Sequence, residues 1–479
     1  MFLKRYYDEG LAQASYLLGC ARTGEAIVID ANRDVEQYLA TAAAEKLRIT
    51  HITETHIHAD YVSGSRELAH ATGGRLYLSA EGGPDWQYAF AERDGAVLLH
   101  DGDILKVGNI RIEVMHTPGH TPEHLAFLVT DTAGADAPIG IASGDFVFVG
   151  DVGRPDLLER AAKVANTMEA GARTLFHSLE RFRALPDFVQ VWPGHGAGSA
   201  CGKSLGAVPT STVGYEKRFN WGVGTTDEAQ FVEMVLAGQP EPPFYFAQMK
   251  RINREGPRVL GGFPVPGHAT LPVLERALAS DVAVIDLRPA VDFAQAHVPG
   301  TINIPFNKSF STWAGWLVRY DQDLHLIADS EATVQRAVRE LAMIGLDRVT
   351  TWYAAAVLGE WQEAGHPVGT VARIDVAAAA PRIARHEVTV LDVRNRTEWE
   401  AGHLAGALHI PVGYLAERLA EIPRDKPIVV HCQGGARSAI ATSVLQRLGV
   451  SGATDLLGGF QAWEAAGQRV VRDGVPEAA

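Results

Sequence analysis

Side chains able to bind a metal cluster in the segment THIHADY, residues 55–61. His56, His58 and Asp60 alternate along it, and Tyr61 ends the run. Imidazole nitrogens and carboxylate oxygens bind divalent metals through lone pairs, and one short loop can hold several of them close together. A phenol has a reference pKa of about 10 and is a poor ligand at neutral pH. The segment therefore predicts a metal site whose ligands stop at Asp60.

Three later segments carry further candidate ligands. PGHT contributes His120, ASGD contributes Asp145 and PGHG contributes His195. Each segment follows an apolar run typical of a buried strand, so these side chains are expected at strand ends, where ligands from separate strands can converge. His116 and His124 flank the PGHT segment and are expected to be loop or supporting residues.

A second kind of chemistry is indicated by IVVHCQGGAR, residues 428–437. A β-branched run ends before Cys432, a glycine-rich turn follows, and Arg437 lies in a helix-like stretch. Backbone N–H groups at a helix N-terminus and a nearby guanidinium favour a thiolate and can cradle an added anionic sulfur. We therefore expect Cys432 to be a nucleophile assisted by Arg437. The residues between them would line a loop sized for one sulfur atom: Gln433, Gly434, Gly435 and Ala436.

The elements that position these residues fall into a β-rich first part and a repeated second part. In the first part, YLLGC and AIVID read as strands and VEQYLATAAAEKL reads as a helix. A proline- and glycine-rich stretch over residues 238–266 indicates a boundary. Beyond it, VIDLRPAVDFAQAHVPGTINIPF from Val284 matches VLDVRNRTEWEAGHLAGALHIPV from Val390 at a constant offset, which predicts two copies of one α/β domain.

Taken together, these motifs resemble two known families. HxHxD, PGHT, GD and PGHG resemble the metallo-β-lactamase superfamily over about residues 1–240, and the Cys432 segment with LLGGFQAW resembles the rhodanese sulfurtransferases. The order of the parts is similar to that of persulfide dioxygenase/rhodanese fusion proteins. The resemblance implies an α/β fold, an αββα sandwich over residues 1–245, followed by rhodanese-like domains over 246–372 and 373–479. The first rhodanese copy has no cysteine and is expected to be inactive.

The resemblance also implies a ligand set. Superfamily hydrolases have a histidine, a ligand to a second metal, at the position of Tyr61. Its replacement implies a single iron(II) per chain, bound by His56, His120 and Asp145. Arg154 would bind the charged persulfide, although an ordinary surface ion pair with Asp156 or Glu159 is the alternative. The residues expected to support the ligands and bound water are His58, Asp60, Tyr61 and His195, the last of which could also contact substrate.

The function implied is oxidation of a low-molecular-weight thiol persulfide with O2 to sulfite and thiol, coupled to rhodanese transfer of sulfur to or from thiosulfate. One rival is a binuclear thioester hydrolase of the glyoxalase II kind, and a metal count separates the two. Another rival is a non-enzymatic sulfur-carrier scaffold, which O2 uptake with a persulfide would exclude. Neither the identity of the thiol nor the direction of sulfur flow can be read from these motifs.

The composition excludes some classes of binding partner. The formal net charge of -14 and a pI near 5.7 argue against nucleic-acid or anionic-membrane partners. No apolar run approaches the roughly 20 residues of a membrane helix, so a cytoplasmic protein is expected, and a homo-oligomer stays open. Three widely spaced cysteines make a disulfide framework improbable. Cys20 is expected to be a small buried residue, and an inert role is slightly favoured for Cys201.

Overall fold

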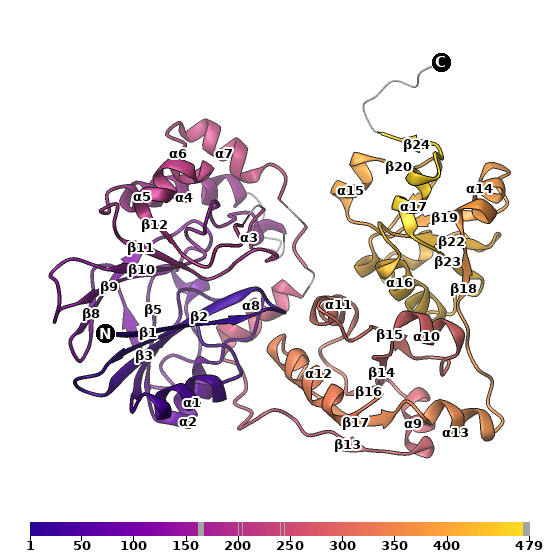
Figure 1. Ribbon diagram of the computed structural model, residues 1–479, viewed down its shortest axis with the longest axis horizontal. Coiled ribbons are helices and arrows are strands. Elements are labelled where there is room, and N and C mark those ends of the chain that lie inside the picture. The colour runs from indigo at the N-terminus through magenta and orange to yellow at the C-terminus, as the bar shows by residue number, and fades with distance from the viewer. Residues whose placement is uncertain (161–166, 200, 204, 240, 244, 473–479) are drawn as a thin grey trace. The chain divides into compact units, whose positions relative to one another are not determined.

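The structure is a computed structural model that describes residues 1–160, 167–199, 201–203, 205–239, 241–243 and 245–472. It forms two compact units (Figure 1). Unit 1 comprises Met1–Phe263 and Ala342–Gly345, and unit 2 comprises Pro264–Leu341 and Leu346–Ala479. The candidate metal ligands lie in unit 1 and Cys432 lies in unit 2, so each site can be described within its own unit.

Unit 1 is built on two six-stranded mixed sheets. The first runs, in spatial order, β1 (Phe2–Asp8), β2 (Gln13–Cys20), β3 (Glu25–Ile29), β4 (Arg48–Thr53), β5 (Arg75–Ser79) and β6 (Val97–Leu99). The second runs β12 (Ser211–Thr212), β11 (Gln190–Pro193), β10 (Gly140–Gly144), β9 (Leu125–Asp131), β8 (Ile110–His116) and β7 (Ile104–Val107). In the first sheet β1 to β3 are antiparallel and β3 to β6 are parallel.

The two sheets bury one core between them and one on each outer face. Leu18 and Ile29 of the first sheet share the inner core with Phe127 and Trp192 of the second. The helices of the outer layers are α1 (Glu36–Ala44) and α2 (Ser65–Thr72) against the first sheet, and α4 (Met168–Arg183), α5 (Val213–Phe219), α6 (Trp221–Gly224) and α7 (Glu228–Leu236) against the second. Two further helices are α3 (Leu157–Arg160) and α8 (Phe246–Glu255), with a 3-10 turn at Pro84–Trp86. The predicted αββα sandwich is confirmed.

Unit 2 contains two five-stranded parallel sheets with the same strand order. The first repeat has β13 (Gly267–His268), α9 (Leu271–Leu278), β14 (Ala283–Asp286), α10 (Ala290–Gln295), β15 (Ile302–Asn303), α11 (Phe310–Leu317), β16 (Leu324–Ala328), α12 (Glu331–Met343), β17 (Val349–Ala354) and α13 (Val357–Glu363). Its strands lie in the order β13, β17, β16, β14, β15. All neighbouring pairs are parallel.

The second repeat has β18 (Ala372–Ile374), α14 (Val376–Ala384), β19 (Thr389–Asp392), α15 (Arg396–Ala401), β21 (Leu408–His409), β22 (Ile428–His431), α16 (Ala436–Arg447), β23 (Ala453–Leu456) and α17 (Gly459–Ala465). Its order β18, β23, β22, β19, β21 matches that of the first repeat strand for strand. A small antiparallel pair, β20 (His403–Leu404) with β24 (Val470–Val471), and 3-10 turns at Val412–Tyr414 and Leu419–Glu421 complete it. The sequence repeat from Val284 and Val390 is therefore a repeat of topology.

Strand ends place the candidate metal ligands and Cys432 on loops, as the sequence predicts. β4 ends before His56, β8 before His120, β10 directly before Asp145 and β11 before His195, while β22 ends directly before Cys432. Within the described residues no helix is long and apolar enough to cross a membrane.

Candidate functional sites

The structure brings His56, His120 and Asp145 together in the buried interior of unit 1. One ligand atom from each lies within 4.8 Å of the others. The Nε2 atom of His120 is 3.5 Å from Oδ2 of Asp145, and that of His56 is 4.0 Å from the same oxygen. Ligand atoms at this spacing can share one ion with bonds of about 2.0–2.2 Å. The three residues thus form a candidate metal site.

Hydrogen bonds on the far side of each imidazole aim its Nε2 atom at this site. Nδ1 of His56 lies 3.0 Å from Oγ1 of Thr55, and that hydroxyl donates to Oδ2 of Asp30 at 2.9 Å. Nδ1 of His120 lies 3.0 Å from the backbone oxygen of Arg154. Partners of this kind fix the ring orientation and tautomer of metal-binding histidines.

The electrostatics of the three residues also suit a metal. Burial lowers the pKa of His56 well below its usual value and lowers that of His120, so both rings stay neutral and keep a lone pair. Neither carboxylate oxygen of Asp145 has a hydrogen-bond partner of standard geometry among the described residues. A buried carboxylate without donors is costly. Two neutral imidazoles and this carboxylate therefore fit a divalent ion such as iron(II).

His58 faces away from this set. Its Nε2 atom lies 3.1 Å from Oδ1 of Asp30, and both side chains are buried. Burial alone would lower the pKa of His58, but the Asp30 carboxylate raises it to about 9. The supporting role of His58 stays a prediction. Asp30 itself was missed in the sequence because it lies at the end of another strand, far from the HxHxD motif.

Asp60 and His195 form a second buried cluster with Cys201, again with ligand atoms within 4.8 Å of one another. Nε2 of His195 is 3.3 Å from Oδ2 of Asp60 and 3.5 Å from Oδ1 of Asp145, so the two clusters are adjacent. The sequence analysis favours an inert role for Cys201. The signal that could have placed it here is the glycine-rich loop it shares with His195.

Tyr61 does not join either cluster. It is 0% exposed, its hydroxyl accepts from Nε2 of Gln13 at 3.3 Å, and it lies 3.4 Å from the backbone oxygen of Asp30. Burial raises the pKa of Tyr61 well above its usual value. The residue is therefore a neutral phenol bound within the protein.

Arg154 is fully buried, which differs from the expected alternative of a surface ion pair. Its guanidinium binds Asp156 through Nε and Nη2, each at 2.8 Å, so the expected ion-pair partner is correct but the pair is internal. The backbone oxygen of Arg154 contacts a metal-ligand candidate, His120. A substrate-binding role for the guanidinium stays a prediction.

The candidate nucleophile lies at the start of α16 in unit 2. Cys432 is buried, and its Sγ atom accepts from the backbone N–H of Gly435 at 3.1 Å and from the hydroxyl of Ser438 at 3.6 Å. Gly435 has a φ of 102°, a conformation that favours glycine, and this lets its N–H turn back toward the sulfur. The predicted cradle of N–H groups is thus seen at Gly435, while Ala436 begins the helix.

Arg437 lies between an acid and the sulfur. Its two terminal nitrogens bind the two carboxylate oxygens of Glu398, each at 2.6 Å, and both Glu398 and Cys432 raise the pKa of Arg437 against the effect of burial. Gln433 accepts from Nη1 of Arg394 at 3.2 Å, which ties the loop to β19. The contact of Ser438 with Cys432 could have been predicted from the sequence, because Ser438 follows Arg437 directly. The ion pair of Glu398 with Arg437 could not have been predicted, because no motif joins Glu398 to the Cys432 loop.

The first repeat has an acid where the second has its cysteine. β16 corresponds to β22 in the sheet order, and Asp329 follows β16 directly, as Cys432 follows β22. A carboxylate cannot carry sulfane sulfur. Inactivity of this repeat in sulfur transfer remains a prediction.

Comparisons with known proteins agree with this architecture. The model of the metallo-beta-lactamase superfamily matches residues 8–195, and that of the rhodanese-like domain matches residues 375–466. A solved metallo-beta-lactamase structure from Staphylococcus aureus is 45% identical, covers 74% of this chain and 99% of its own, and superposes with a TM-score of 0.68. The chain therefore belongs to the metallo-beta-lactamase superfamily. More particularly, it is a metallo-beta-lactamase-fold protein that carries a rhodanese-like domain.

Two curated relatives with different activities match the front of the chain. A hydroxyacylglutathione hydrolase from Polaromonas sp. is 32% identical over 182 residues, which is 38% of this chain and 61% of that protein. A mitochondrial persulfide dioxygenase from Bos taurus is 28% identical over 200 residues, which is 41% of this chain and 68% of that protein. Identity at this level supports an enzyme of this superfamily without choosing between the two reactions.

Proposed function

We propose that unit 1 is a persulfide dioxygenase with one iron(II), and that unit 2 transfers sulfane sulfur at Cys432. The observation that carries the proposal is Tyr61. In the hydrolases this position holds a histidine for a second metal, whereas here the hydroxyl is bound to Gln13 and the ring is buried. The first cluster, His56, His120 and Asp145, keeps its full donor set.

The bound iron would supply the redox chemistry of O2, which fits a set of two imidazoles and one carboxylate. The overall reaction balances as one persulfide, one O2 and one water giving one thiol, one sulfite and two protons. The protein's own contribution is orientation and protection. Thr55 and the Arg154 backbone hold the imidazoles. Burial of the ligands in unit 1 keeps bulk water away from the reacting sulfur.

The rhodanese-like site completes the sequence of reactions. The Cys432 thiolate attacks the outer sulfur of a persulfide, the sulfur–sulfur bond breaks, and the thiol leaves with the electron pair. Sulfite then attacks the outer sulfur on Cys432, which gives thiosulfate and regenerates the thiolate. Arg437 and the N–H of Gly435 stabilise negative charge on sulfur in both steps. Placing both sites on one chain raises the effective concentration of sulfite near its acceptor.

A second candidate function rests on the cluster of Asp60, His195 and Cys201. These side chains could hold a second ion beside Asp145, and two metals are what a thioester hydrolase of the glyoxalase II kind uses. This cluster differs from the first because it has the thiol of Cys201 where the first cluster has a second imidazole. The two functions therefore differ in metal count and in substrate.

The experiment that separates them is a substrate panel on the iron-reconstituted protein. Thiol persulfides should cause O2 uptake recorded with an oxygen electrode, and acyl thioesters should be hydrolysed slowly or not at all. Thioester hydrolysis without O2 uptake would replace the dioxygenase with the hydrolase. If neither substrate reacts while Cys432 still accepts sulfur, unit 1 is not an enzyme of either kind.

A further inference from the structure

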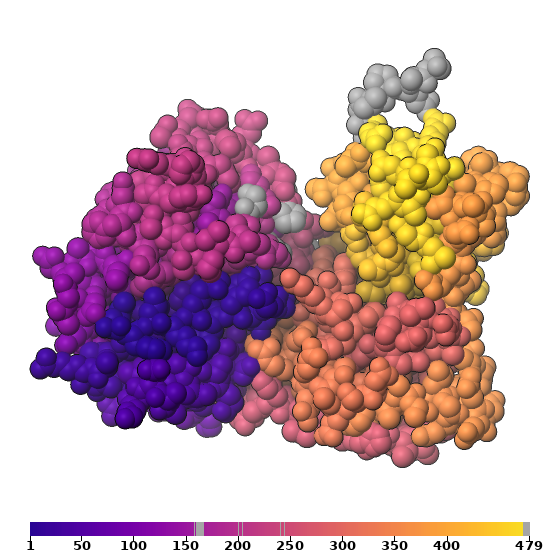
Figure 2. All heavy atoms as spheres, in the orientation of Figure 1, coloured from indigo at the N-terminus to yellow at the C-terminus, as the bar shows by residue number. Residues whose placement is uncertain are grey.

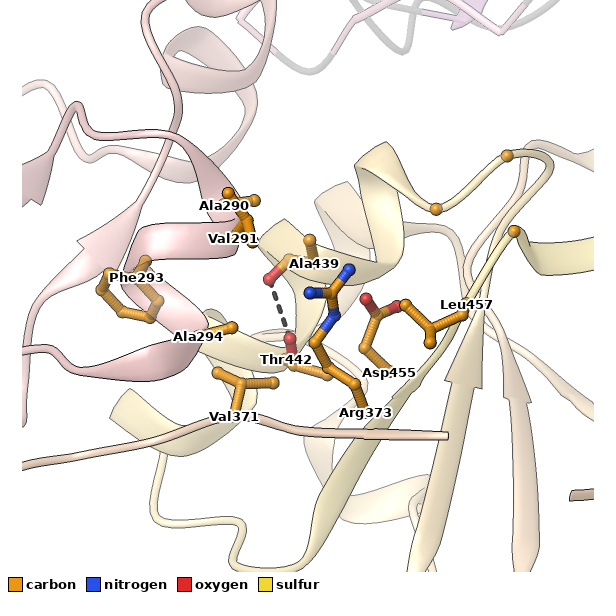
Figure 3. A pocket seen from close by; sticks show the side chains of 13 residues that line it. Ala290, Val291, Phe293, Ala294, Val371, Arg373, Ala439, Thr442, Asp455 and Leu457 are labelled. Carbon is orange, nitrogen blue, oxygen red and sulfur yellow. Dashed lines mark hydrogen bonds between the residues drawn. The ribbon is translucent and has the colours of Figure 1, made fainter. Parts of the chain in front are cut away.

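A cavity of about 160 Å³ lies in unit 2 beside the Cys432 loop (Figure 3). Helix α10 of the first repeat forms an apolar wall that includes Val291 and Ala294. The second repeat forms the opposite side with Gly434, Gly435 and Asp455, and Arg373 of β18 reaches in from the edge. Figure 2 shows the atoms of the two repeats packed against each other, and α10 and α16 are in contact.

Asp455 and Arg373 bring opposite charges to this cavity. Asp455 is 5% exposed, and its Oδ1 atom has no hydrogen-bond partner in the described part of the chain. The Arg373 side chain makes no hydrogen bond or ion pair with any described residue, yet its charge acts on Asp455. Figure 3 shows the guanidinium and the carboxylate next to each other within the cavity. Buried polar atoms are normally satisfied, so the unpaired oxygen of Asp455, with the exposed guanidinium of Arg373 beside it, indicates a ligand with complementary charges.

The cavity is continuous with the surroundings of the nucleophile. Gly435 lines it and donates its N–H to Sγ of Cys432 at 3.1 Å. Ser438 links the two sides, because its hydroxyl lies 3.6 Å from the same sulfur and its side chain also lowers the pKa of Asp455, which burial raises. A ligand held by Asp455 and Arg373 would therefore lie close to the reacting sulfur.

We propose that this cavity binds the organic part of the sulfur donor or acceptor of Cys432, and that this compound is a small thiol with an α-amino acid end. Its carboxylate pairs with Arg373 and its ammonium group pairs with Asp455. The inference rests on the sulfur transfer proposed for Cys432 and adds the class of thiol. It also gives the first repeat a role, since α10 supplies the wall that closes the cavity.

The step is an exchange that needs no oxidant. The Cys432 thiolate bonds to the outer sulfur of the persulfide, the original sulfur–sulfur bond breaks, and the free thiolate leaves with that electron pair. It then takes a proton from solvent. In the reverse direction the same thiol accepts the sulfur from Cys432, so the cavity serves donor and acceptor alike.

The test follows the addition of about 32 Da to the peptide that bears Cys432, by mass spectrometry of the full-length protein. Four donors are compared: cysteine persulfide, with both charges; 3-mercaptopropionate persulfide, with the carboxylate only; cysteamine persulfide, with the ammonium only; and thiosulfate, with no organic part. The readout is the loading rate of each persulfide divided by that of thiosulfate. Cysteine persulfide should exceed both single-charge persulfides by about tenfold.

The variants should remove this preference one charge at a time. Arg373→Gln should lower the ratio for the two donors with a carboxylate, and Asp455→Asn should lower it for the two with an ammonium, each by about tenfold. Val291→Trp, at a position 45% exposed on the α10 wall, should lower the ratio for all three persulfides. The matched controls are Arg382→Gln on α14 and Val265→Trp, the latter at an 89% exposed position of the first repeat.

Equal loading by all three persulfides, with Arg373→Gln matching Arg382→Gln, would overturn the cavity assignment while leaving sulfur transfer in place. Failure of every donor, thiosulfate included, to load Cys432 would instead overturn the proposed sulfur transfer itself. If Asp455→Asn does not fold, the exposed Arg373 still decides the outcome.

Discussion

The guanidinium of Arg437 binds the carboxylate of Glu398 through two parallel hydrogen bonds of 2.6 Å, and it also interacts electrostatically with Cys432. Glu398 therefore sets the position from which Arg437 stabilises the sulfur. We expect Glu398→Gln to slow thiosulfate sulfurtransferase turnover by about tenfold or more, because misplacing a catalytic group by about 1 Å can cost up to about a hundredfold. The matched control is Glu421→Gln, which breaks an exposed pair with Arg418 in the same repeat. Equal rates in the two variants would show that Glu398 does not position Arg437.

Cys432→Ser should separate the two activities. The substitution removes the thiol of Cys432, which is the cysteine of the two rhodanese-like repeats. The metal-ligand candidates all lie in unit 1. Sulfurtransferase activity should vanish, O2 uptake with a thiol persulfide should persist, and sulfite should accumulate in place of thiosulfate. Chromatography of the sulfur products measures this directly. Cys20→Ser is the control, and sulfur transfer that survives in Cys432→Ser would move the nucleophile to Cys201.

Asp145→Ala should strip the metal from unit 1, because its carboxylate faces the imidazoles of His56 and His120 and is the carboxylate of this ligand set. Elemental analysis after anaerobic reconstitution should show iron falling from about one equivalent to near zero, and O2 uptake should fall with it. Asp136→Ala, in the exposed loop between β9 and β10, should keep both. Full iron content in Asp145→Ala would contradict the ligand set.

Tyr61→His should let a second ion bind next to Asp60 and His195, since an imidazole would replace a neutral phenol there. Metal content should rise above one equivalent when zinc is supplied. Tyr61→Phe, which also loses the contact with Gln13 but offers no ligand, should stay at one equivalent. A rise in both variants, or in neither, would show that Tyr61 does not limit the metal count.

The sequence predicts the sites best where local pattern and chemistry coincide. His56, His120 and Asp145 each follow an apolar strand, so their convergence could be expected from strand ends alone. Relationships between distant segments could not be predicted, because no periodicity encodes them. The Asp30 partner of His58 and the Glu398 partner of Arg437 are of this kind.

The conformation of loops was the other feature that could not be predicted from the sequence. Cys201 lies within 4.8 Å of Asp60 and His195, measured between one ligand atom of each, and the glycine-rich sequence around it carries no pattern that predicts this position. The full burial of Arg154 could not be predicted, since long charged side chains are rarely buried unless paired, and its pairing with Asp156 explains the exception. The αββα sandwich and the repeated sheet order were accessible because both follow from strand patterning and from the internal repeat.

The most direct test of the account is a titration of the wild-type protein with a thiol persulfide, with its metal content measured on the same sample. With about one iron per chain, each persulfide consumed should remove one O2 and, in Cys432→Ser, release one sulfite. Two metal ions per chain, with thioester hydrolysis and no O2 uptake on adding persulfide, would contradict it.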